Sequence, residues 1–177
     1  MGRIVVHAFT TLDGVIDASP PRVYQPYMDD ETMQETMALL TEVDGQLLGR
    51  DTYQHLAKAW SPQTGPVADR VNAMPKYVLS RTLRSADDWA NTTIVGYDEV
   101  PELRERLNLV SYGCGRLARD LLRDGLLDEV QLWVVPVVAG SGARLFGGPD
   151  ELLTLRFAAS RAFATGVVRS TYVGPGA

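Results

Sequence analysis

The sequence predicts an α/β fold in which helices cover both faces of one largely parallel sheet. Short segments rich in β-branched residues alternate with helical segments along most of the chain, and this alternation is typical of parallel sheets because each crossover carries a helix. The last two apolar segments, residues 157–163 and 167–173, flank Thr165 and Gly166 and predict an antiparallel hairpin at the C-terminal edge. No linker-like segment interrupts the 177 residues, so we expect a single domain over residues 1–177.

The composition is that of an ordinary globular protein and argues against several functional classes. Hydrophobic residues make up 45% of the chain and charged residues 22%. The 17 Lys and Arg against 22 Asp and Glu give a net charge of −5, which disfavours nucleic acid as a partner. The apolar runs are far shorter than the roughly 20 residues of a spanning helix, and the N-terminus has no secretory signal pattern. We therefore expect a cytoplasmic protein with no membrane partner.

The first strand and helix are predicted from composition and helix-start signals. Residues 3–10 are too few for a typical helix and rich in β-branched residues, which predicts a strand. Residues 17–28 contain three of the ten prolines and predict a surface loop. A helix begins at Asp29, where carboxylates face the positive end of the helix dipole. For its apolar residues we favour core packing over a ligand pocket: Met33, Met37, Leu40 and Val43.

The middle of the chain alternates between short strands and helices. Strands are predicted at residues 46–48, 76–80, 92–95, 108–112 and 127–138. Helices are predicted from Thr52 to about residue 59, around Pro101 as a first-turn proline, and from Gly115 to the C-terminal glycine Gly125. Residues 61–65 are a predicted turn.

Three strand-to-helix junctions have the chemistry expected of phosphate sites, which in open α/β sheets lie at the carboxyl ends of the strands. In the first, two glycines permit close approach and the helix N-terminus offers N–H groups to an anion. In the other two, an arginine lies beside a strand end and a hydroxyl residue. For the glycine junction the open alternative is tight helix–sheet packing without a ligand. For the other two junctions it is a solvated surface arginine. The junctions comprise Gly113, Cys114, Gly115, Arg116 and Leu117; Gly49, Arg50 and Thr52; and Ser80 and Arg81.

Other chemistries have weaker support. Residues 113–118 fit the glycine pattern of a Rossmann dehydrogenase, but they lie late in the chain and the expected acidic residue after the next strand is missing. No G-x-S-x-G elbow is present. His7 and His55 lack metal-ligand spacing, so we expect structural roles for both and no metal site. For Cys114, the single cysteine, packing or close approach of a cofactor is favoured over nucleophilic catalysis.

Five segments occur in an order that matches a known family. They are TLDGVI at residues 11–16, VDGQLLGRDT at 43–52, YVLSR at 77–81, GLLDE at 125–129 and PVVAGSGARLF at 136–146. These segments resemble the dihydrofolate reductase superfamily. The closer match is to the group that includes the reductase domain of the bifunctional riboflavin-biosynthesis deaminase–reductase. The D-D-P-x-L-T segment with which riboflavin reductases handle their ribose-phosphate substrate is not matched in residues 55–72.

The resemblance implies a dihydrofolate reductase-like three-layer α/β/α fold with about eight strands and NADPH bound across the carboxyl edge. It implies that Ala8, Gly14, Val15 and Ile16 frame the nicotinamide. It also implies phosphate contacts from Gly49, Arg50 and Thr52, 2′-phosphate contacts from Ser80 and Arg81, and pyrophosphate contacts from Gly113, Gly115, Arg116 and Leu117, with Cys114 beside them.

The implied activity is hydride transfer from NADPH to a pterin- or pyrimidine-like ring, such as 5-amino-6-(5-phosphoribosylamino)uracil in riboflavin biosynthesis. Asp13 is a candidate for orienting the substrate or relaying a proton, and an Asx turn at the strand exit is the equally open alternative. Asp30, or its neighbour Asp29, is a positional candidate for the helix carboxylate of folate reductases. The candidate substrate-facing residues are Leu12, Tyr24, Gln25, Tyr27 and Trp60.

Two other functions stay open at this point. They are a dihydrofolate reductase-type activity and NADPH binding without turnover. A homodimer through the C-terminal hairpin is also plausible from the apolar residues at its edge.

Overall fold

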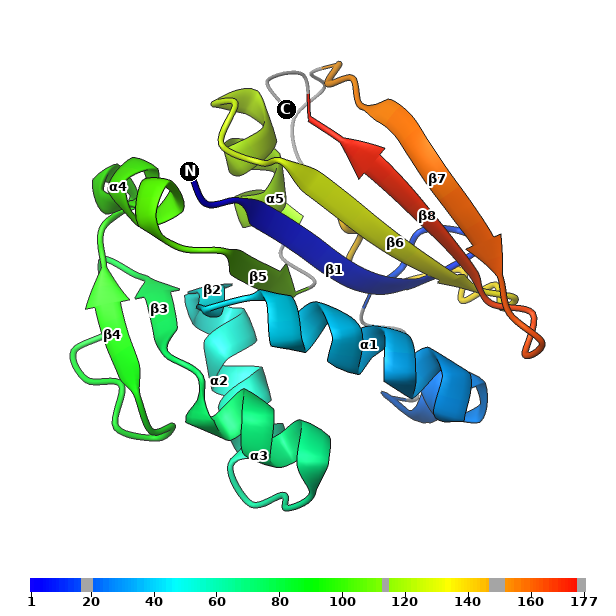
Figure 1. Cartoon of the computed structure of the whole chain (residues 1–177), viewed down its shortest axis with the longest axis horizontal. Coiled ribbons are helices and arrows are strands. Elements are labelled where there is room, and N and C mark those ends of the chain that lie inside the picture. Colours follow the sequence, from blue (N-terminus) through cyan, green and yellow to red (C-terminus); the bar gives the residue numbers. More distant parts are fainter. Residues whose placement is uncertain (17–20, 113–114, 147–151, 175–177) are drawn as a thin grey trace.

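A computed structural model describes residues 1–16, 21–112, 115–146 and 152–174, and its strands form one sheet (Figure 1). The strands are β1 (Ile4–Thr11), β2 (Gly45–Gly49), β3 (Lys76–Leu79), β4 (Thr92–Val95), β5 (Leu109–Tyr112), β6 (Glu129–Val135), β7 (Arg156–Ala162) and β8 (Val168–Val173). The helices are α1 (Asp30–Glu42), α2 (Arg50–Trp60), α3 (Pro66–Ala73), α4 (Val100–Arg106) and α5 (Gly115–Arg123), with short 3-10 helices η1 (Pro21–Tyr27) and η2 (Tyr97–Glu99). Among the described residues, no helix is both long and apolar enough to cross a bilayer.

The eight strands run in the order β4-β3-β2-β5-β1-β6-β8-β7. The first six are parallel to one another, and β8 is antiparallel to both of its neighbours. This order confirms the predicted mostly parallel sheet with an antiparallel C-terminal hairpin. From β2 the chain adds β3 and then β4 outward toward one edge of the sheet. It then returns and places β5 between β2 and β1. Ligands of open sheets bind near such a change of direction.

Four local features differ from the predictions. Helix α3 was not predicted, although Pro66 at its first position is a typical helix-start residue. Helix α2 begins at Arg50, two residues before the predicted start. Strand β6 ends at Val135 instead of residue 138, because Pro136 has no N–H group to continue the ladder. The predicted loop before α1 contains the 3-10 helix η1.

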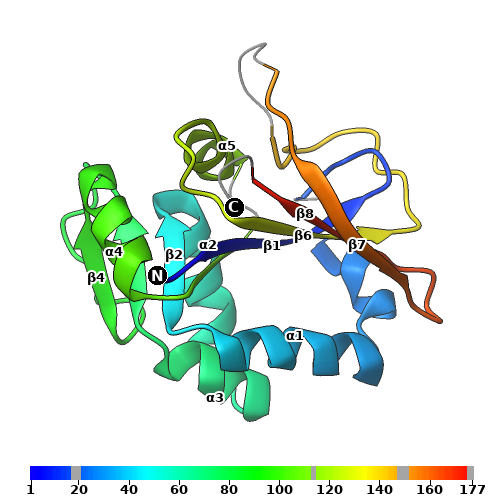
Figure 2. The same ribbon diagram turned by 45° about the horizontal axis from the view of Figure 1, so that its top comes forward.

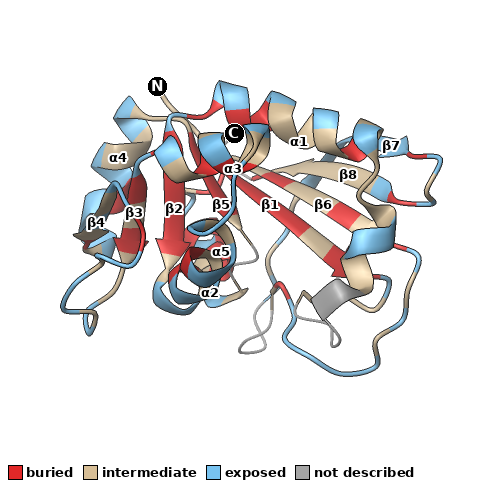
Figure 3. Cartoon of the chain, turned by 90° about the horizontal axis from the view of Figure 1, so that it is seen from below, coloured by how far each residue is buried: buried red, intermediate tan, exposed pale blue. Residues whose placement is uncertain are grey.

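Helices cover both faces of the sheet (Figure 2). Helices α1, α2 and α3 pack on one face, where they bury Val5, Leu48, Val78 and Val110. Helices α4 and α5 pack on the other face, against Ile4, Val6, Ala8 and Leu109. The buried residues concentrate in the central strands (Figure 3), as expected for parallel strands that are covered on both sides.

The GLLDE segment, residues 125–129, connects β1, α4 and β6 at the amino edge of the sheet. Gly125, with φ of +68°, follows the end of α5, a conformation that glycine adopts without strain. The Asp128 carboxylate accepts hydrogen bonds from the Ile4 N–H at 2.7 Å and from Arg104 Nε at 2.9 Å, and it also contacts Arg104 Nη2. This segment therefore has a structural explanation, because Asp128 joins β1 and α4 to the start of β6.

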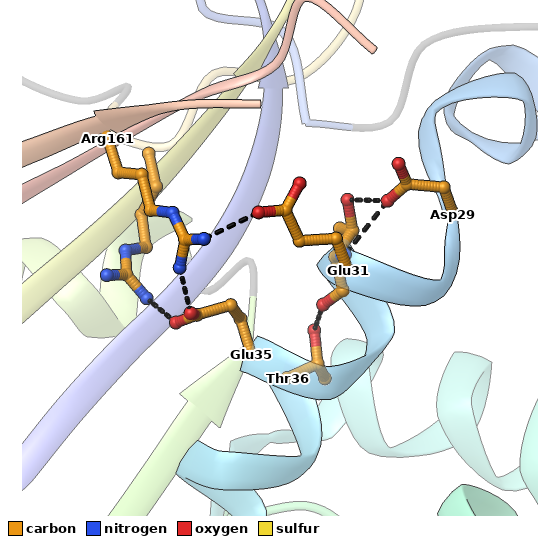
Figure 4. Close-up of polar contacts among 7 residues, drawn as sticks. Asp29, Glu31, Glu35, Thr36 and Arg161 are labelled. Atoms are coloured by element: carbon orange, nitrogen blue, oxygen red, sulfur yellow. Dashed lines mark hydrogen bonds and ion pairs between the residues drawn. The ribbon is translucent and has the colours of Figure 1, made fainter. Parts of the chain in front are cut away.

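A network of ion pairs holds the N-terminal half of α1 against the C-terminal hairpin (Figure 4). Glu31 accepts from Arg161 at 2.5 Å, and Glu35 contacts Arg161 and accepts from Arg169 at 2.5 Å. Asp29 caps the same helix by accepting from the Thr32 N–H at 2.9 Å. These contacts anchor helix α1 to β7 and β8.

Candidate functional site

The predicted phosphate-binding junctions follow strands that are neighbours in the sheet. Strands β3, β2 and β5 lie side by side in parallel. Ser80 and Arg81 follow β3, Arg50 follows β2, and Gly115 begins the helix after β5. Gly113 and Cys114 lie outside the described residues. The structure thus brings the three junctions together at one carboxyl edge.

The arginines at this edge are accessible. Arg50 donates from Nη1 to the Thr82 hydroxyl at 3.0 Å, which links the second junction to the third, and its Nε lies 3.5 Å from Asp51. Arg81 is exposed, and the Arg116 side chain is 91% exposed. Ser80 Oγ accepts from the Leu83 N–H at 2.9 Å and so shapes the turn. An anion at this edge can therefore be reached by more than one guanidinium.

The N-terminus of α2 offers backbone donors as well. Its N-cap is Gly49, which has no side chain to cap the first turn, so the first N–H groups of the helix remain for another partner. Thr52 lies within this turn and is partly exposed. A helix N-terminus whose N–H groups are not capped by a side chain can bind a phosphate group.

The turn after β1 is held rigidly by Asp13. Its carboxylate accepts from the Thr11 hydroxyl at 2.6 Å and from the Ala139 and Gly140 N–H groups at 3.0 and 2.8 Å. These hydrogen bonds, above all the one from Thr11, hold the pKa of Asp13 well below its usual range. The carboxylate is therefore ionised at neutral pH and carries no proton to relay. The geometry favours the turn-stabilising alternative for this residue.

Two further contacts fix the segment that is expected to frame the nicotinamide. Gly14 has φ of +79°, and the Ile16 N–H donates to the Ala143 carbonyl at 2.9 Å. Tyr24 Oη donates to the Val15 carbonyl at 2.9 Å. Beside the turn lies a cavity of about 280 Å³, lined by Thr10, Gly14, Leu132, Arg144, Leu145 and Phe146. Ala8 and Val15 are buried, whereas Gly14 and Ile16 are partly exposed and are the residues of this segment that a ligand can contact.

We expect replacement of Asp13 by alanine to loosen this turn locally. The Ala139 and Gly140 N–H groups lose their acceptor, so their amide hydrogen exchange should accelerate by roughly tenfold or more while the central strands keep their protection. Hydrogen exchange followed by NMR or mass spectrometry measures this, with the exposed Asp51→Asn variant as control. Unchanged exchange at both amides would show that the turn does not depend on Asp13.

A second, larger cavity lies between the sheet and helices α1, α2 and α3. Its volume is about 390 Å³. Strands β1, β2 and β5 supply the floor, and η1 and the three helices supply the rest. The lining residues are His7, Phe9, Tyr24, Gln25, Met28, Met33, Thr36, Leu40, Gln46, Leu56, Trp60, Val67, Val71 and Tyr112. The hydroxyl of Tyr24 joins this cavity to the turn that contains Gly14 and Val15.

The predicted substrate-facing residues fall into two groups. Tyr24, Gln25 and Trp60 line the larger cavity. Leu12 is 63% exposed instead, because it lies in the turn beyond the end of β1. Tyr27 packs against the cluster around Trp133, and neither residue is part of the described cavity wall.

Asp30 is also placed away from this cavity. It is the exposed first residue of α1, and it borders a shallow surface depression with Met33, Gln34 and Met37, of which only Met33 also lines the cavity. Its neighbour Asp29 is engaged as the helix cap. The structure therefore does not bring the candidate helix carboxylate to the cavity, because the first turn of α1 directs it outward.

The sequence prediction missed most of the cavity floor. His7 was expected to be structural, and Met33 was expected to pack in the core, yet both line the cavity. Phe9 and Gln46 were not singled out. The available signal was the alternation along β1, which places His7 and Phe9 on the same face of the strand.

Comparison with known proteins assigns the family. The family model described as "RibD C-terminal domain" matches residues 3–169. The chain belongs to the RibD C-terminal domain family. Protein YyaP of Bacillus subtilis (strain 168), itself uncharacterized, is 31% identical over 180 residues, which cover 96% of this chain and 94% of YyaP.

Solved structures show the same fold at low sequence identity. A protein of Shewanella sp. PV-4 with a proposed role in riboflavin biosynthesis has a TM-score of 0.74 at 21% identity, with 97% of this chain and 98% of that chain covered. The dihydrofolate reductase of Enterococcus faecalis, in complex with NADP(H), has a TM-score of 0.62 at 13% identity, with 98% and 97% covered. These similarities confirm the dihydrofolate reductase-like fold of this RibD-type domain.

Proposed function

We propose that this RibD-type domain is an NADPH-dependent reductase that transfers hydride to a small pterin- or pyrimidine-like ring. One observation carries the proposal. The four segments expected to contact the cofactor occur in the sequence after β1, β2, β3 and β5, but the sheet orders these strands β3-β2-β5-β1. A single extended ligand along the carboxyl edge can therefore pass all four segments in turn.

Each part of the dinucleotide has residues with suitable chemistry along this path. Ser80 and Arg81 would hold the 2′-phosphate after β3, since an arginine can bind a phosphate through two parallel hydrogen bonds. Arg50 and the first turn of α2 would neutralise phosphate charge beside them. Gly115 to Leu117 would bind the pyrophosphate at the N-terminus of α5. The turn at Gly14 to Ile16 would receive the nicotinamide.

When bound, NADPH would supply a hydride from nicotinamide C4, and the protein would supply the relative position of cofactor and substrate. The carbon of a substrate C=N or C=O bond would take up the hydride and its heteroatom a proton from solvent, which would leave NADP⁺ as the oxidised product. Tyr24 spans from the cavity wall to the Val15 carbonyl, so one side chain can set the distance between the substrate and the nicotinamide turn.

The two alternative functions have less support. A dihydrofolate reductase-type activity calls for a helix carboxylate at the substrate, and Asp30 does not line the described cavity. If the protein bound NADPH without turnover, the cavity of about 390 Å³ beside the expected nicotinamide turn would have no role. A homodimer through β7 and β8, and a cytoplasmic location, stay predictions; β7 is exposed along its length.

Substitution of the edge arginines tests the cofactor assignment. We expect Arg50→Ala and Arg81→Ala each to weaken NADPH binding by about tenfold, or roughly 1.4 kcal/mol, while NADH binding changes little for Arg81→Ala because NADH lacks the 2′-phosphate. Arg106→Ala is the matched control, since Arg106 ends α4 where the chain enters β5 at the opposite edge. Nicotinamide fluorescence measures both affinities. Equal losses for both cofactors in Arg81→Ala would contradict the 2′-phosphate role.

A further inference from the structure

The chemistry of the larger cavity restricts the charge of what it can bind. Its floor and walls are mostly aromatic and aliphatic, and no Asp, Glu, Lys or Arg is among its described lining residues. A phosphate or carboxylate placed there would lose its hydration without gaining a cation from the described lining residues in return, which costs several kcal/mol.

Several basic side chains on neighbouring elements are already engaged elsewhere. Arg161 and Arg169 are bound by Glu31 and Glu35 of α1 (Figure 4). Arg70 of α3 donates to the Leu40 and Val43 carbonyls at 2.9 and 2.7 Å. Recruiting any of them to an anionic substrate would break existing contacts.

Lys76 is engaged in the same way. It is fully buried, and its ammonium donates to the Asn72 carbonyl at 2.5 Å and to the Ala90 carbonyl at 3.0 Å. Its ammonium also lies 4.5 Å from the centre of the Trp89 ring. These partners fix it beneath α3, so it too cannot serve an anion in the cavity without losing them.

Two polar side chains interrupt the apolar floor. The Gln46 amide donates from Nε2 to the Val71 carbonyl at 2.9 Å, which leaves Oε1 as a buried acceptor with no partner in the described part of the chain. His7 Nδ1 is likewise buried and has no partner among the described residues. Burial lowers the pKa of His7 to about 4, so the imidazole is uncharged at neutral pH. The floor thus offers hydrogen-bonding groups without net charge.

The His7 ring also belongs to an aromatic surface. Its centroid lies 5.5 Å from that of Phe9, 5.9 Å from that of Tyr112 and 5.5 Å from that of Trp133. Flat conjugated rings pack favourably against such edges and faces. Among uncharged ligands, the cavity is therefore suited to planar ones.

We propose that this cavity selects an uncharged, planar and largely apolar ring substrate, with an N–H group recognised by Gln46 and His7, and that it rejects phosphorylated or carboxylated forms of the same ring. This inference rests on the proposed reductase function and narrows its substrate class. It sets this chain apart from a reductase whose substrate carries a ribose phosphate.

A matched pair of ligands tests the charge selectivity. Quinoxalin-2(1H)-one is planar and uncharged, has one N–H donor, and contains a C=N bond that can accept hydride at carbon and a proton at nitrogen. Its 3-carboxylate derivative differs by one negative charge. Tryptophan fluorescence quenching at pH 7, with and without NADPH, gives both dissociation constants. We expect the uncharged ligand to bind at least tenfold more tightly, and equal or tighter binding of the carboxylate would overturn the proposal.

Variants test the assigned polar contact. Gln46→Leu should weaken quinoxalin-2(1H)-one binding about tenfold without changing NADPH affinity, whereas Gln54→Leu, an exposed glutamine on α2, should change neither. A thermal melt checks that Gln46→Leu is folded. The comparison of the two ligands is made on the unaltered protein, so the test of charge selectivity does not depend on whether the variant folds. Full retention of ligand affinity in folded Gln46→Leu would contradict the role of Gln46.

The outcomes separate this inference from the proposed function. If NADPH binds but the two ligands show no preference for the uncharged form, the inference on substrate charge fails and the cofactor assignment stands. If the uncharged ligand is preferred but NADPH does not bind, the cavity assignment stands and the reductase proposal fails.

Discussion

Replacement of Asp128 by asparagine is expected to lower the free energy of unfolding by about 3 kcal/mol. The Asp128 carboxylate pairs with Nε and Nη2 of Arg104 and accepts from the Ile4 N–H, and both charged side chains are only 14% exposed. Asparagine keeps one acceptor but removes the charge, which leaves the Arg104 guanidinium partly buried without its counter-ion. The contacts lie at the amino edge of the sheet, so cofactor binding at the carboxyl edge should survive wherever the variant is folded.

Urea unfolding measures this loss, with a matched control on the same helix. Glu102 and Arg106 form an exposed ion pair on α4, with side chains 74% and 69% exposed, so Glu102→Gln should cost less than about 0.5 kcal/mol. A double-mutant cycle with Arg104→Met isolates the pair from the Ile4 contact. A decrease in the free energy of unfolding below about 1 kcal/mol for Asp128→Asn would contradict a stabilising role of the Asp128 contacts.

The stability of the protein is expected to fall as the pH is lowered from 6.5 toward 4 because of His7. Burial lowers the pKa of His7 from 6.5 to about 4; a hydrogen bond with Gln131 opposes this shift and the charge of Arg169 adds to it. Above pH 6.5 the imidazole is neutral in both states. Between pH 6.5 and 4 only the unfolded chain takes up the proton, so stability decreases. The full effect of this one group is about 3 kcal/mol.

His7→Gln is the variant that isolates this effect, since glutamine cannot titrate. We expect the difference in unfolding free energy between the unaltered protein and the variant to change by about 2 to 3 kcal/mol between pH 7 and pH 4.5. Replacement of His55, an exposed histidine on α2, by glutamine serves as the control. Parallel pH profiles for the unaltered protein and His7→Gln would contradict the burial of an uncharged His7.

The fold could be anticipated because its signals are local. Alternating strands and helices, the proline at the start of α4 and the glycine after α5 each act within a few residues of their own position. The placement of β5 between β2 and β1 could not be derived in this way, since strand order depends on contacts between distant segments. Helix α3 was missed because its eight residues carry too few apolar positions to show a clear period.

In the candidate site, too, the features with local sequence signals could be predicted and those that depend on distant segments could not. The junctions at Arg50 and Arg81 were visible because a strand end and a helix start are adjacent in sequence. A turn role for Asp13 was one of two open predictions, but its long-range contacts were not visible, because the donors Ala139 and Gly140 come from a loop 126 and 127 residues away. The cavity floor was also hidden, since Gln46 lies in an otherwise apolar strand and becomes informative only when its unpartnered oxygen is seen.

Titration of the purified protein with NADPH and with NADH, followed by nicotinamide fluorescence, tests the central claim most directly. The order of the four segments along the carboxyl edge predicts saturable NADPH binding, and the position of Arg81 predicts at least tenfold weaker binding of NADH, a difference of about 1.4 kcal/mol. Absence of binding for both cofactors would contradict the reductase assignment and leave the carboxyl edge to a different ligand.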